Sequence, residues 1–562
     1  MRALRSSTWE LVRSRIHPPF RLSTGVGIPG VTRYRCASTV LPDSTARPRS
    51  DVNNLEPLPK PFEKRERGQR DQKWSRFPRY ATYGLVGTGL YLGLSYLFHP
   101  DPSEYSPSLA RQPTSTLLRS YLVWTLTSFP SIVDAAPMVL DFVFTTTIPG
   151  IRPLGEFIVR RTFFPQFIPG ETAEECVPAM EEMRRRNVGH ALNYSAEADV
   201  IDVGAKKGIA GGEAVDPSLA RFREIERALE VQGEFERRMA EEGWARGSSA
   251  FALKTTGLID PAILIRASNA MHRLHEAHSP STTAESLAKG TLYPGAPQLI
   301  SRAVLAPASL EIPSIPHGSV ERMKVLKDDL SLVEGDLAAL KLLWERLDSL
   351  VSRAKRNGIR FIIDAEESFY QPALDGYTQL LSIKYNKPPI GIDEAAWTGP
   401  VVYGTYQSYL TRQPAFIQAC LAHAAENGYA LGLKVVRGGY IVKENAYVKK
   451  PGRQGISPIW PTKQETDAAY NHAVSTLLST LSSQLARPSS STALSVIFGT
   501  HNRESVDTVI SQLEAQGLAA LGHTGKLKLR EDVQGRVGIA QLYGEGEAFV
   551  SHRTSADGRN EG

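Results

Sequence analysis

The sequence predicts an α/β protein, a parallel barrel of alternating strands and helices preceded by a helical N-terminal region. Short apolar runs recur between residues 187 and 544, and most are followed by a segment with helical periodicity. Asp364, Glu366 and Glu367 follow directly after one of these runs, Phe361–Ile363. A buried strand that delivers carboxylates at its C-terminal end is typical of the active face of a parallel α/β barrel.

The composition is that of a largely globular protein. Of the 562 residues, 41% are hydrophobic and 22% are charged, which suits one large barrel with appended segments. The net charge of +6 comes largely from the N-terminus and does not indicate nucleic-acid binding. Cys36, Cys176 and Cys420 are far apart and fit neither a metal motif nor a disulfide framework, which favours a reducing compartment.

Residues 1–50 have the composition of a mitochondrial presequence. Positions 2–50 carry nine arginines, no lysine and only two acidic residues, and serine and threonine are frequent. A disordered basic tail is the alternative. Residues 51–79 are polar, contain proline and are rich in charge, as expected of a linker.

Residues 80–98 form a candidate transmembrane helix. This stretch has 19 residues and no charge. As a helix it would span about 28 Å, close to the hydrocarbon thickness of a bilayer. Lys73, Arg76 and Arg79 precede it, and tyrosines near both ends suit interface anchors. A buried helix is the alternative.

Residues 100–186 predict a helical arm broken by Pro130, Pro137, Pro153 and Pro165. Asp134 and Asp141 interrupt its apolar stretch, which favours core helices over a second membrane span. The last helix of the arm, 172–186, leads into the first barrel strand.

The barrel is predicted over residues 187–544. Strands are expected at 190–194, 251–254, 361–363, 400–407, 431–436, 494–498 and 537–542, and helices at 217–242, 331–357, 414–427, 466–485 and 503–516. Residues 276–318, rich in Pro, Ser and Ala, form an expected insertion. Eight strands close such a barrel, and no eighth strand or final helix is recognisable. The polar, glycine-rich residues 545–562 are expected to be a disordered tail.

Polar residues at the predicted strand ends are the candidate site. They are Lys254, Asp364, Gln407, Lys434, Arg437, Tyr440, His501 and Asn502. In a parallel barrel these positions converge on one face. Because a barrel-lining lysine is costly unless it meets an anion or a dipole, Lys254 and Lys434 indicate an anionic ligand.

Each candidate also has a structural explanation. Asp364 and the two lysines could belong to ion pairs, Tyr440 could be a core aromatic, and Asn502 could cap the helix that follows it. Arg437 and Gly438 could form an ordinary turn, or the glycine could permit the close backbone approach with which an arginine grips a phosphate.

Five ordered motifs resemble the proline dehydrogenase (proline oxidase) family. They are IDAEE at 363–367, TYQSYL at 405–410, KVVRGGY at 434–440, PTKQETDAAY at 461–470 and GTHN at 499–502. The resemblance covers roughly residues 163–544, and the N-terminal region is similar in style to fungal mitochondrial members.

The resemblance implies a distorted (βα)8 barrel that binds FAD, oxidises L-proline to Δ1-pyrroline-5-carboxylate and passes electrons to membrane ubiquinone. The barrel would face the mitochondrial matrix at the inner membrane. Lys254 would pair with the proline carboxylate, Tyr440 would pack against the proline ring, and Asp364 would organise the site. Lys434 would lie near the flavin N5 edge, Gln407 would hydrogen-bond the isoalloxazine, and the rest of FAD would be held by Arg437, Gly438, His501 and Asn502.

The chain departs from the family pattern after the seventh strand. Family members continue with an eighth strand and a helix carrying an Arg-Arg pair that grips the substrate carboxylate. No such element is recognisable here, so poor or no activity is expected of the chain as written. Two other functions stay open: a catalytically dead membrane-associated relative, and a barrel lyase or aldolase that uses Lys254 or Lys434 as a Schiff-base nucleophile.

Overall fold

A computed structural model describes residues 114–194, 216–244, 247–278, 305, 332–388, 399–449, 457–487, 491–522 and 527–544. All of them fall within the larger of the two compact units into which the chain divides. The predicted presequence (1–50), linker (51–79), transmembrane helix (80–98) and tail (545–562) lie outside the described residues. So does the 276–318 insertion, except for residues 276–278 and 305.

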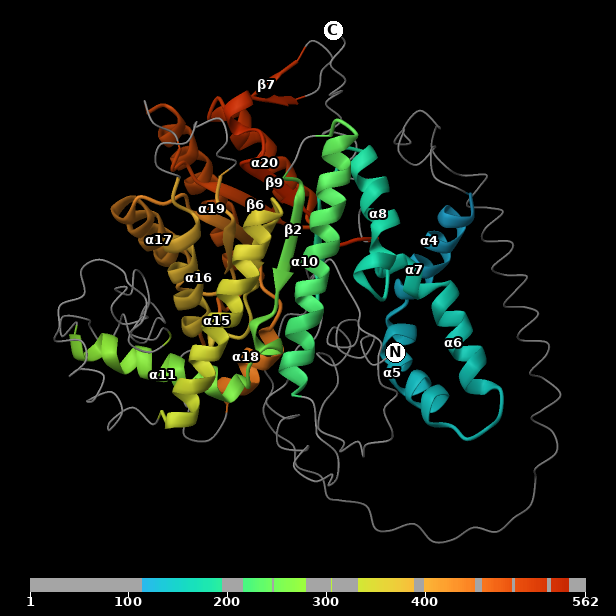
Figure 1. Ribbon diagram of the computed structural model, residues 1–562. Coiled ribbons are helices and arrows are strands. Elements are labelled where there is room, and N and C mark those ends of the chain that lie inside the picture. Colours follow the sequence, from blue (N-terminus) through green and yellow to red (C-terminus); the bar gives the residue numbers. More distant parts are fainter. Residues whose placement is uncertain are drawn as a thin grey trace, which may run out of the picture. The chain divides into compact units, whose positions relative to one another are not determined.

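The described residues form a seven-stranded sheet in which every neighbouring pair is parallel (Figure 1). Its order is β1 (His190–Asn193), β2 (Ser249–Leu253), β3 (Arg360–Ile363), β4 (Val402–Gln407), β5 (Gly432–Val436), β6 (Ser495–Gly499) and β9 (Val537–Ala540). The seven predicted strands are therefore confirmed, with ends shifted by up to two residues. Within the described residues β1 and β9 are the edge strands.

Helices follow the strands in the alternation that the sequence predicts. They are α10 (Pro217–Glu241), α11 (Pro261–His278), α15 (Glu334–Arg356), α16 (Gln371–Tyr385), α17 (Gln413–Asn427), α18 (Ile441–Val448), α19 (Lys463–Leu485) and α20 (Arg503–Ala515). Gly358 and Gly428 follow the C-termini of α15 and α17 with φ of 68° and 63°, a left-handed conformation that favours glycine. Three helices, α11, α16 and α18, and the antiparallel hairpin β7 (Ala519–Leu521) and β8 (Leu527–Leu529) are additional to the predicted elements.

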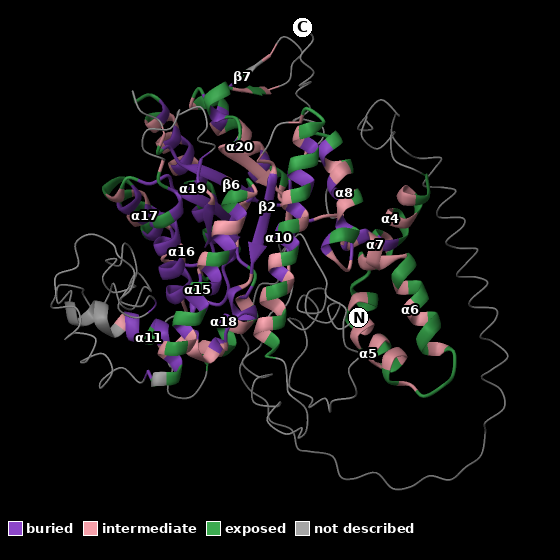
Figure 2. Ribbon diagram, viewed as in Figure 1, coloured by how far each residue is buried: buried purple, intermediate pink, exposed green. Residues whose placement is uncertain are grey.

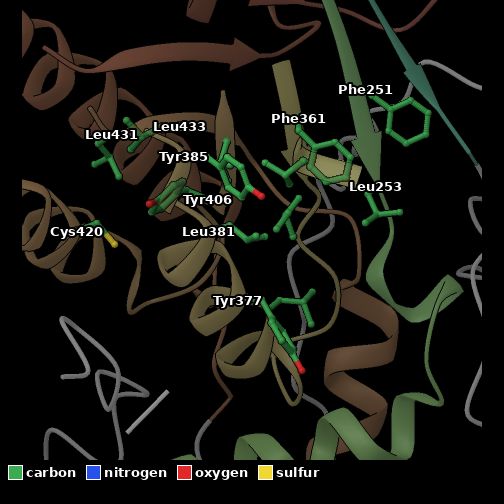
Figure 3. Close-up of a cluster of buried hydrophobic side chains, with 14 of the residues drawn as sticks. Phe251, Leu253, Phe361, Tyr377, Leu381, Tyr385, Tyr406, Cys420, Leu431 and Leu433 are labelled. Atoms are coloured by element: carbon green, nitrogen blue, oxygen red, sulfur yellow. The ribbon is translucent and has the colours of Figure 1, made fainter. Parts of the chain in front are cut away.

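The two faces of the sheet bury different side chains. One face carries a small cluster of Ala250, Ala252, Ile362 and Tyr403, which the strand register brings side by side. The opposite face belongs to the main hydrophobic core, where the residues that alternate with these pack against the helices. Figure 3 shows part of that core, with Phe251, Leu253, Phe361, Tyr406 and Leu433 on the strands and Tyr377, Leu381, Tyr385 and Cys420 on the helices.

The first face also carries polar residues toward the C-terminal ends of its strands. Thr405 follows Tyr403 by two residues on β4 and is paired in register with Lys434 on β5. Because side chains alternate along a strand and register partners point to the same side, both side chains lie on the face of the small cluster. An apolar interior therefore gives way to a polar one at the end of the sheet where the predicted site residues lie.

Five helices precede β1: α4 (Thr114–Thr127), α5 (Pro130–Thr145), α6 (Ile151–Arg161), α7 (Phe163–Phe167) and α8 (Ala173–Arg185). The predicted break at Pro137 is wrong, because Pro137 lies inside α5. Pro130, Pro153 and Pro165 lie in the first turns of α5, α6 and α7, where a missing N–H breaks no intrahelical bond, so the helical arm is interrupted at or just before each of them. Thr172 caps α8 by accepting a hydrogen bond from the backbone N–H of Glu175, as a helix beginning at that position requires.

The prediction that the arm consists of core helices is wrong for α4, α5 and α6, whereas α8 contributes Ala173, Cys176 and Met180 to the main core. Val123 is the one buried residue described in α4, and α5 and α6 have none (Figure 2). Their helical periodicity is real, but their apolar stripes face outward in the described structure.

Candidate active site

Asp364 and Lys434 form a buried ion pair at the C-terminal edge of the sheet. Lys434 Nζ donates a hydrogen bond to Asp364 Oδ1 over 2.6 Å, and both side chains are at most one-tenth exposed. The Thr405 hydroxyl donates to the same oxygen at 3.3 Å, and Asn193 Nδ2 donates to Oδ2 at 3.3 Å. Four strands, β1, β3, β4 and β5, thus meet at one carboxylate.

The electrostatics of Asp364 show which lysines face it. Burial acts to raise the pKa of this carboxyl group. The charges of Lys434 and Lys254, together with the hydrogen bonds from Lys434 and Thr405, outweigh burial and hold the pKa below its usual value. Asp364 is therefore ionised at neutral pH, and its negative charge lies within reach of both predicted site lysines.

Lys254 and Tyr440 are the second pair of predicted residues that the fold brings together. Lys254 follows the last residue of β2, and Tyr440 is the N-cap residue of α18 after β5. Lys254 Nζ donates a hydrogen bond to the Tyr440 hydroxyl and lies 5.0 Å from the centre of its ring. The pair places a cation beside an aromatic ring, which suits recognition of a small organic anion with an apolar body.

Carboxylates after Asp364 connect the β3–α16 loop to its neighbours. Glu366 accepts hydrogen bonds from the backbone N–H and the hydroxyl of Thr256, which follows β2. Gln407 Nε2 donates to the backbone carbonyl of Glu366 over 2.8 Å, so this amide supports the loop from β4. These contacts fix the backbone on both sides of Asp364.

Helix α18 is fastened to the same loop by two further carboxylates. Lys443 Nζ lies 2.9 Å from Glu367 Oε1, and the fully buried Glu444 accepts hydrogen bonds from the N–H and hydroxyl of Ser368. Burial, helped by the nearby charge of Glu367, raises the pKa of Glu444 above its usual value despite those hydrogen bonds. Because α18 begins directly after Tyr440, these contacts determine where the Tyr440 ring lies.

Arg437 belongs to a group around the N-termini of α19 and α20. Its Nε, Nη1 and Nη2 donate to Asp467 Oδ1 at 2.7 Å, to the Thr500 hydroxyl at 3.0 Å and to the Ser505 hydroxyl at 2.7 Å. Lys463 lies 2.7 Å from the other oxygen of Asp467, so two cations share one carboxylate. Arg437 and Lys463 outnumber Asp467 in this group, while Glu465 and Glu504 lie in the first turns of α19 and α20. Cations and hydroxyls beside a helix N-terminus are the donors that suit a phosphate.

His501 and Asn502 have structural partners in the described residues. His501 Nε2 accepts the backbone N–H of Leu542 over 3.0 Å, which ties the end of β6 to the residues after β9. Burial lowers the pKa of His501. Asn502 caps α20 by accepting the backbone N–H of Ser505 at 3.2 Å, which matches the structural alternative for this residue.

Gly438 has a φ of 126°, in the positive-φ region that glycine adopts far more readily than other residues. A Cβ atom at this position would lie 2.2 Å from the Tyr409 ring. Glycine therefore permits the turn that leads from Arg437 to Tyr440. A side chain at position 438 would have to displace either the Tyr409 ring or the turn itself.

The geometry also identifies site residues that sequence analysis did not single out. They are Asn193, Thr405, Lys443, Glu444 and Asp467. Asn193 and Thr405 are polar residues at the ends of predicted buried strands, a signal present in the sequence. Asp467 lies within the PTKQETDAAY motif. Lys443 and Glu444 lie on α18, an element absent from the prediction.

A family model described as proline dehydrogenase matches residues 219–551, more than half of the chain. The chain is 26% identical over 359 residues to proline dehydrogenase 1, mitochondrial, of Dictyostelium discoideum, covering 63% of this chain and 51% of the relative. It is 24% identical over 450 residues to proline dehydrogenase 2, mitochondrial, of Arabidopsis thaliana, covering 80% and 79%. It is 26% identical over 412 residues to human hydroxyproline dehydrogenase, covering 72% and 75%.

Among solved structures, the chain is similar to proline utilization A from Bdellovibrio bacteriovorus inactivated by N-propargylglycine. The TM-score is 0.44 and the identity 13%, with 72% of this chain and 30% of that chain covered. The chain thus spans about half the length of the Dictyostelium relative and less than a third of the bacterial protein.

Proposed function

The chain belongs to the proline dehydrogenase family, and from that premise we propose that it oxidises L-proline to Δ1-pyrroline-5-carboxylate. The observation that carries the proposal is the convergence of Lys254–Tyr440 and Asp364–Lys434 at the C-terminal ends of the parallel strands. These four residues come from β2, β3, β5 and the segment after β5. Active sites of parallel α/β barrels lie at this end.

The charges and shapes of these side chains suit the binding of proline. The Lys254 ammonium would pair with the proline carboxylate, and Tyr440 would pack against the ring while its hydroxyl orients that ammonium. Asp364, ionised and bonded to Lys434, would balance the second lysine. Oxidation removes a hydride equivalent from proline C5 and a proton from its nitrogen, which leaves a C=N double bond.

The residues present fit FAD by the chemistry of their donors. Arg437, Lys463, Thr500 and Ser505 near the N-terminus of α20 supply what a pyrophosphate needs, and Lys434 and Gln407 are the groups proposed for its flavin ring. When bound, FAD supplies the two-electron acceptor that no side chain can provide. The protein's part is to orient the donor carbon and to hold the substrate charge. Gly438, His501 and Asn502 would keep the turns around the cofactor in place.

We further propose that electrons pass to ubiquinone and that the barrel faces the matrix at the inner mitochondrial membrane. The presequence-like composition of residues 1–50 supports a mitochondrial location, and the names of the Dictyostelium and Arabidopsis relatives agree with it. Ubiquinone is dissolved in the membrane, so an enzyme that reduces it has to reach the bilayer.

Purification of the full chain and assay with a quinone analogue tests this proposal. We expect a yellow protein that releases FAD on denaturation and turns over L-proline, with Δ1-pyrroline-5-carboxylate trapped as product. Rapid turnover would overturn the expectation of poor activity that the family's Arg-Arg pair suggests, and slow turnover would support it. Hydroxyproline, offered in parallel, distinguishes the activity named for the human relative. Lys254→Met should abolish turnover, while Lys384→Met, in an exposed ion pair with Asp348, should not.

A flavin-loaded protein without turnover of either substrate would instead favour the catalytically dead relative. A colourless protein that borohydride traps covalently on lysine would favour the Schiff-base lyase.

A further inference from the structure

Helices α4, α5 and α6 expose an unusual amount of apolar surface. Within the described residues, every large hydrophobic side chain classed as exposed lies between residues 118 and 158, except Val333, Leu342 and Val442. The exposed group comprises Leu118, Tyr121, Leu122, Trp124, Leu126, Phe129, Ile132, Met138, Val139, Phe142, Ile148, Leu154, Phe157 and Ile158. A contiguous run of this kind marks a surface that contacts something other than water.

The exposed residues of α5 form a stripe. At 100° per residue, Ile132, Met138, Val139 and Phe142 occupy an arc of about 120° on the helix. Asp134 and Asp141 lie together just beyond one edge of that arc by the same geometry. Asp134 and Asp141 therefore border the apolar stripe without interrupting it, so they are no evidence that α5 is a core helix.

The neighbouring helices α4 and α6 each have one side packed against another helix. The inner side of α4 faces α7, where the Ser120 hydroxyl donates to Gln166 and Trp124 packs edge-to-face on Phe167 at 5.7 Å. Gly155 of α6 lies against Val143 of α5, so closely that a Cβ would be 2.3 Å from a Val143 methyl group. Ser120 and Trp124 thus join α4 to α7, and Val143 and Gly155 join α5 to α6. The exposed apolar side chains named above remain beside these contacts.

We propose that α4–α6 lie in the interface of a phospholipid bilayer, with their apolar stripes immersed and their helix axes along the membrane plane. In the described residues no single helix has the length and hydropathy of a membrane span, whereas α4 and α5 meet both criteria as a pair bent by 95°. At 1.5 Å per residue, α4 and α5 are only about 21 and 24 Å long, short of the ~30 Å hydrocarbon core. Two short apolar helices at a right angle fit the plane of the interface better than its normal.

Several side chains at the margins are those expected at a lipid surface, although Asp134 and Asp141 place negative charge beside the α5 stripe. Tyr121 and Trp124 are aromatic residues with a polar group, the kind enriched at the level of the headgroups. Arg160 and Arg161 occupy the last turn of α6, and the guanidinium of Arg161 lies 5.5 Å from the ring of Phe157. An arginine that extends from an apolar stripe suits contact with anionic headgroups.

A fluorescent label that responds to polarity tests the immersion directly. The full chain would carry Cys36→Ser, so that the buried Cys176 and Cys420 are the remaining native thiols. The label would be placed at Phe142→Cys or Phe157→Cys, with Leu342→Cys on α15 as the matched exposed control. Thermal unfolding first confirms that each labelled protein is folded. We then add vesicles of phosphatidylcholine and phosphatidylglycerol, with and without brominated acyl chains.

We expect labels at 142 and 157 to shift to shorter emission wavelength and to be quenched by the brominated lipid, and the label at 342 to do neither. Met138→Gln with Leu154→Gln should raise the lipid concentration needed for half-maximal quenching of the 157 label by about tenfold or more, because the transfer free energy of two apolar side chains is lost. Val333→Gln with Leu342→Gln should leave that concentration unchanged. Vesicles without phosphatidylglycerol report the share of binding that is due to anionic headgroups.

Three results would overturn the proposal. The labelled protein could remain in solution when vesicles float, or it could float while both arm labels stay in water because another segment attaches it. The labels could also shift with rising protein concentration in the absence of lipid, which would mean that a second copy covers the arm. The proposal rests on the proposed membrane partner and not on proline oxidation, and no readout involves turnover, so each can fail separately.

Discussion

Lys434 Nζ lies 2.6 Å from Asp364 Oδ1, which joins β5 to the residue that follows β3 across the intervening strand β4. Thr405 of that middle strand donates to the same oxygen. The carboxylate is thus shared by three neighbouring strands, and its charge is also felt by Lys254. Asp364 is therefore the residue that links the strands of the candidate site.

Asp364→Asn should destabilise the fold strongly. The substitution keeps the shape of the side chain but leaves Lys434 buried without an opposite charge. Removal of one member of a buried pair costs about 3–5 kcal/mol. The free energy of unfolding in urea measures the loss.

The exposed pair Lys384–Asp348 is a matched control, because its N–O distance is also 2.6 Å while its side chains are 42% and 28% exposed. Asp348→Asn should cost at most about 1 kcal/mol, since solvent screens the pair. Equal losses for the two substitutions would contradict the assignment of Asp364.

The stability contributed by Asp364 should depend on pH in one direction. Its folded pKa lies below the unfolded value of about 3.9, so the unfolded state binds more protons in the interval between the two. The contribution is therefore complete above about pH 4 and is lost as the pH falls through the folded pKa. In urea titrations from about pH 7 to about pH 3, the gap between wild type and Asp364→Asn should stay constant and then narrow. A gap that widens toward acid would be inconsistent with an ionised Asp364.

The strands and the convergence at their ends could be predicted because both follow from simple rules. Apolar runs such as Phe361–Ile363 predict buried strands, and parallel strands present their C-terminal ends at one edge. The same rules place Lys254, Asp364, Lys434 and Tyr440 near one another. Which of these residues pair, however, depends on strand register and loop conformation, and periodicity carries no information on either.

Physical properties of the unpredicted elements explain why the sequence did not reveal them. Helix α16 is buried over almost its whole surface, so it lacks the polar face that identifies an amphipathic helix. Strands β7 and β8 have only three residues each, too few for alternation to be recognised. For the arm, the apolar stripes could be read from the sequence, but a stripe does not reveal whether protein or lipid covers it.

Tyr440→Phe should weaken proline binding in the proposed reaction. The substitution keeps the ring but removes the hydroxyl that accepts from Lys254, so the ammonium loses its orientation. A charge-assisted hydrogen bond contributes about 1.5–3 kcal/mol, which predicts a rise in KM for proline of about tenfold or more. Steady-state kinetics measures this rise. Tyr121→Phe on α4 removes a hydroxyl far along the chain from the site and should leave KM as it is; an unchanged KM in Tyr440→Phe would refute the role of the hydroxyl.

Arg437→Lys should reduce the FAD content of the purified protein. A lysine keeps the charge and has three N–H donors, but they radiate from one nitrogen. It therefore cannot reproduce the planar guanidinium, which donates to Asp467, Thr500 and Ser505 from three separate nitrogens. We expect at least about 2 kcal/mol of lost stability and fewer flavins per polypeptide, determined by absorbance after denaturation. Arg503→Lys on α20, where the arginine side chain is 70% exposed, should retain full flavin content. Equal flavin content in the two variants would argue against a phosphate site at Arg437.

In the proposed function, electrons pass from proline to a flavin bound at the C-terminal ends of the parallel strands. Anaerobic mixing of the purified full chain with L-proline tests it without any acceptor, quinone or membrane. We predict that the oxidised flavin absorbance bleaches on mixing with the wild-type protein, and that a Lys254→Met protein with the same flavin content keeps its absorbance. A wild-type flavin that stays oxidised at saturating proline, or a protein that binds no flavin, would contradict the account.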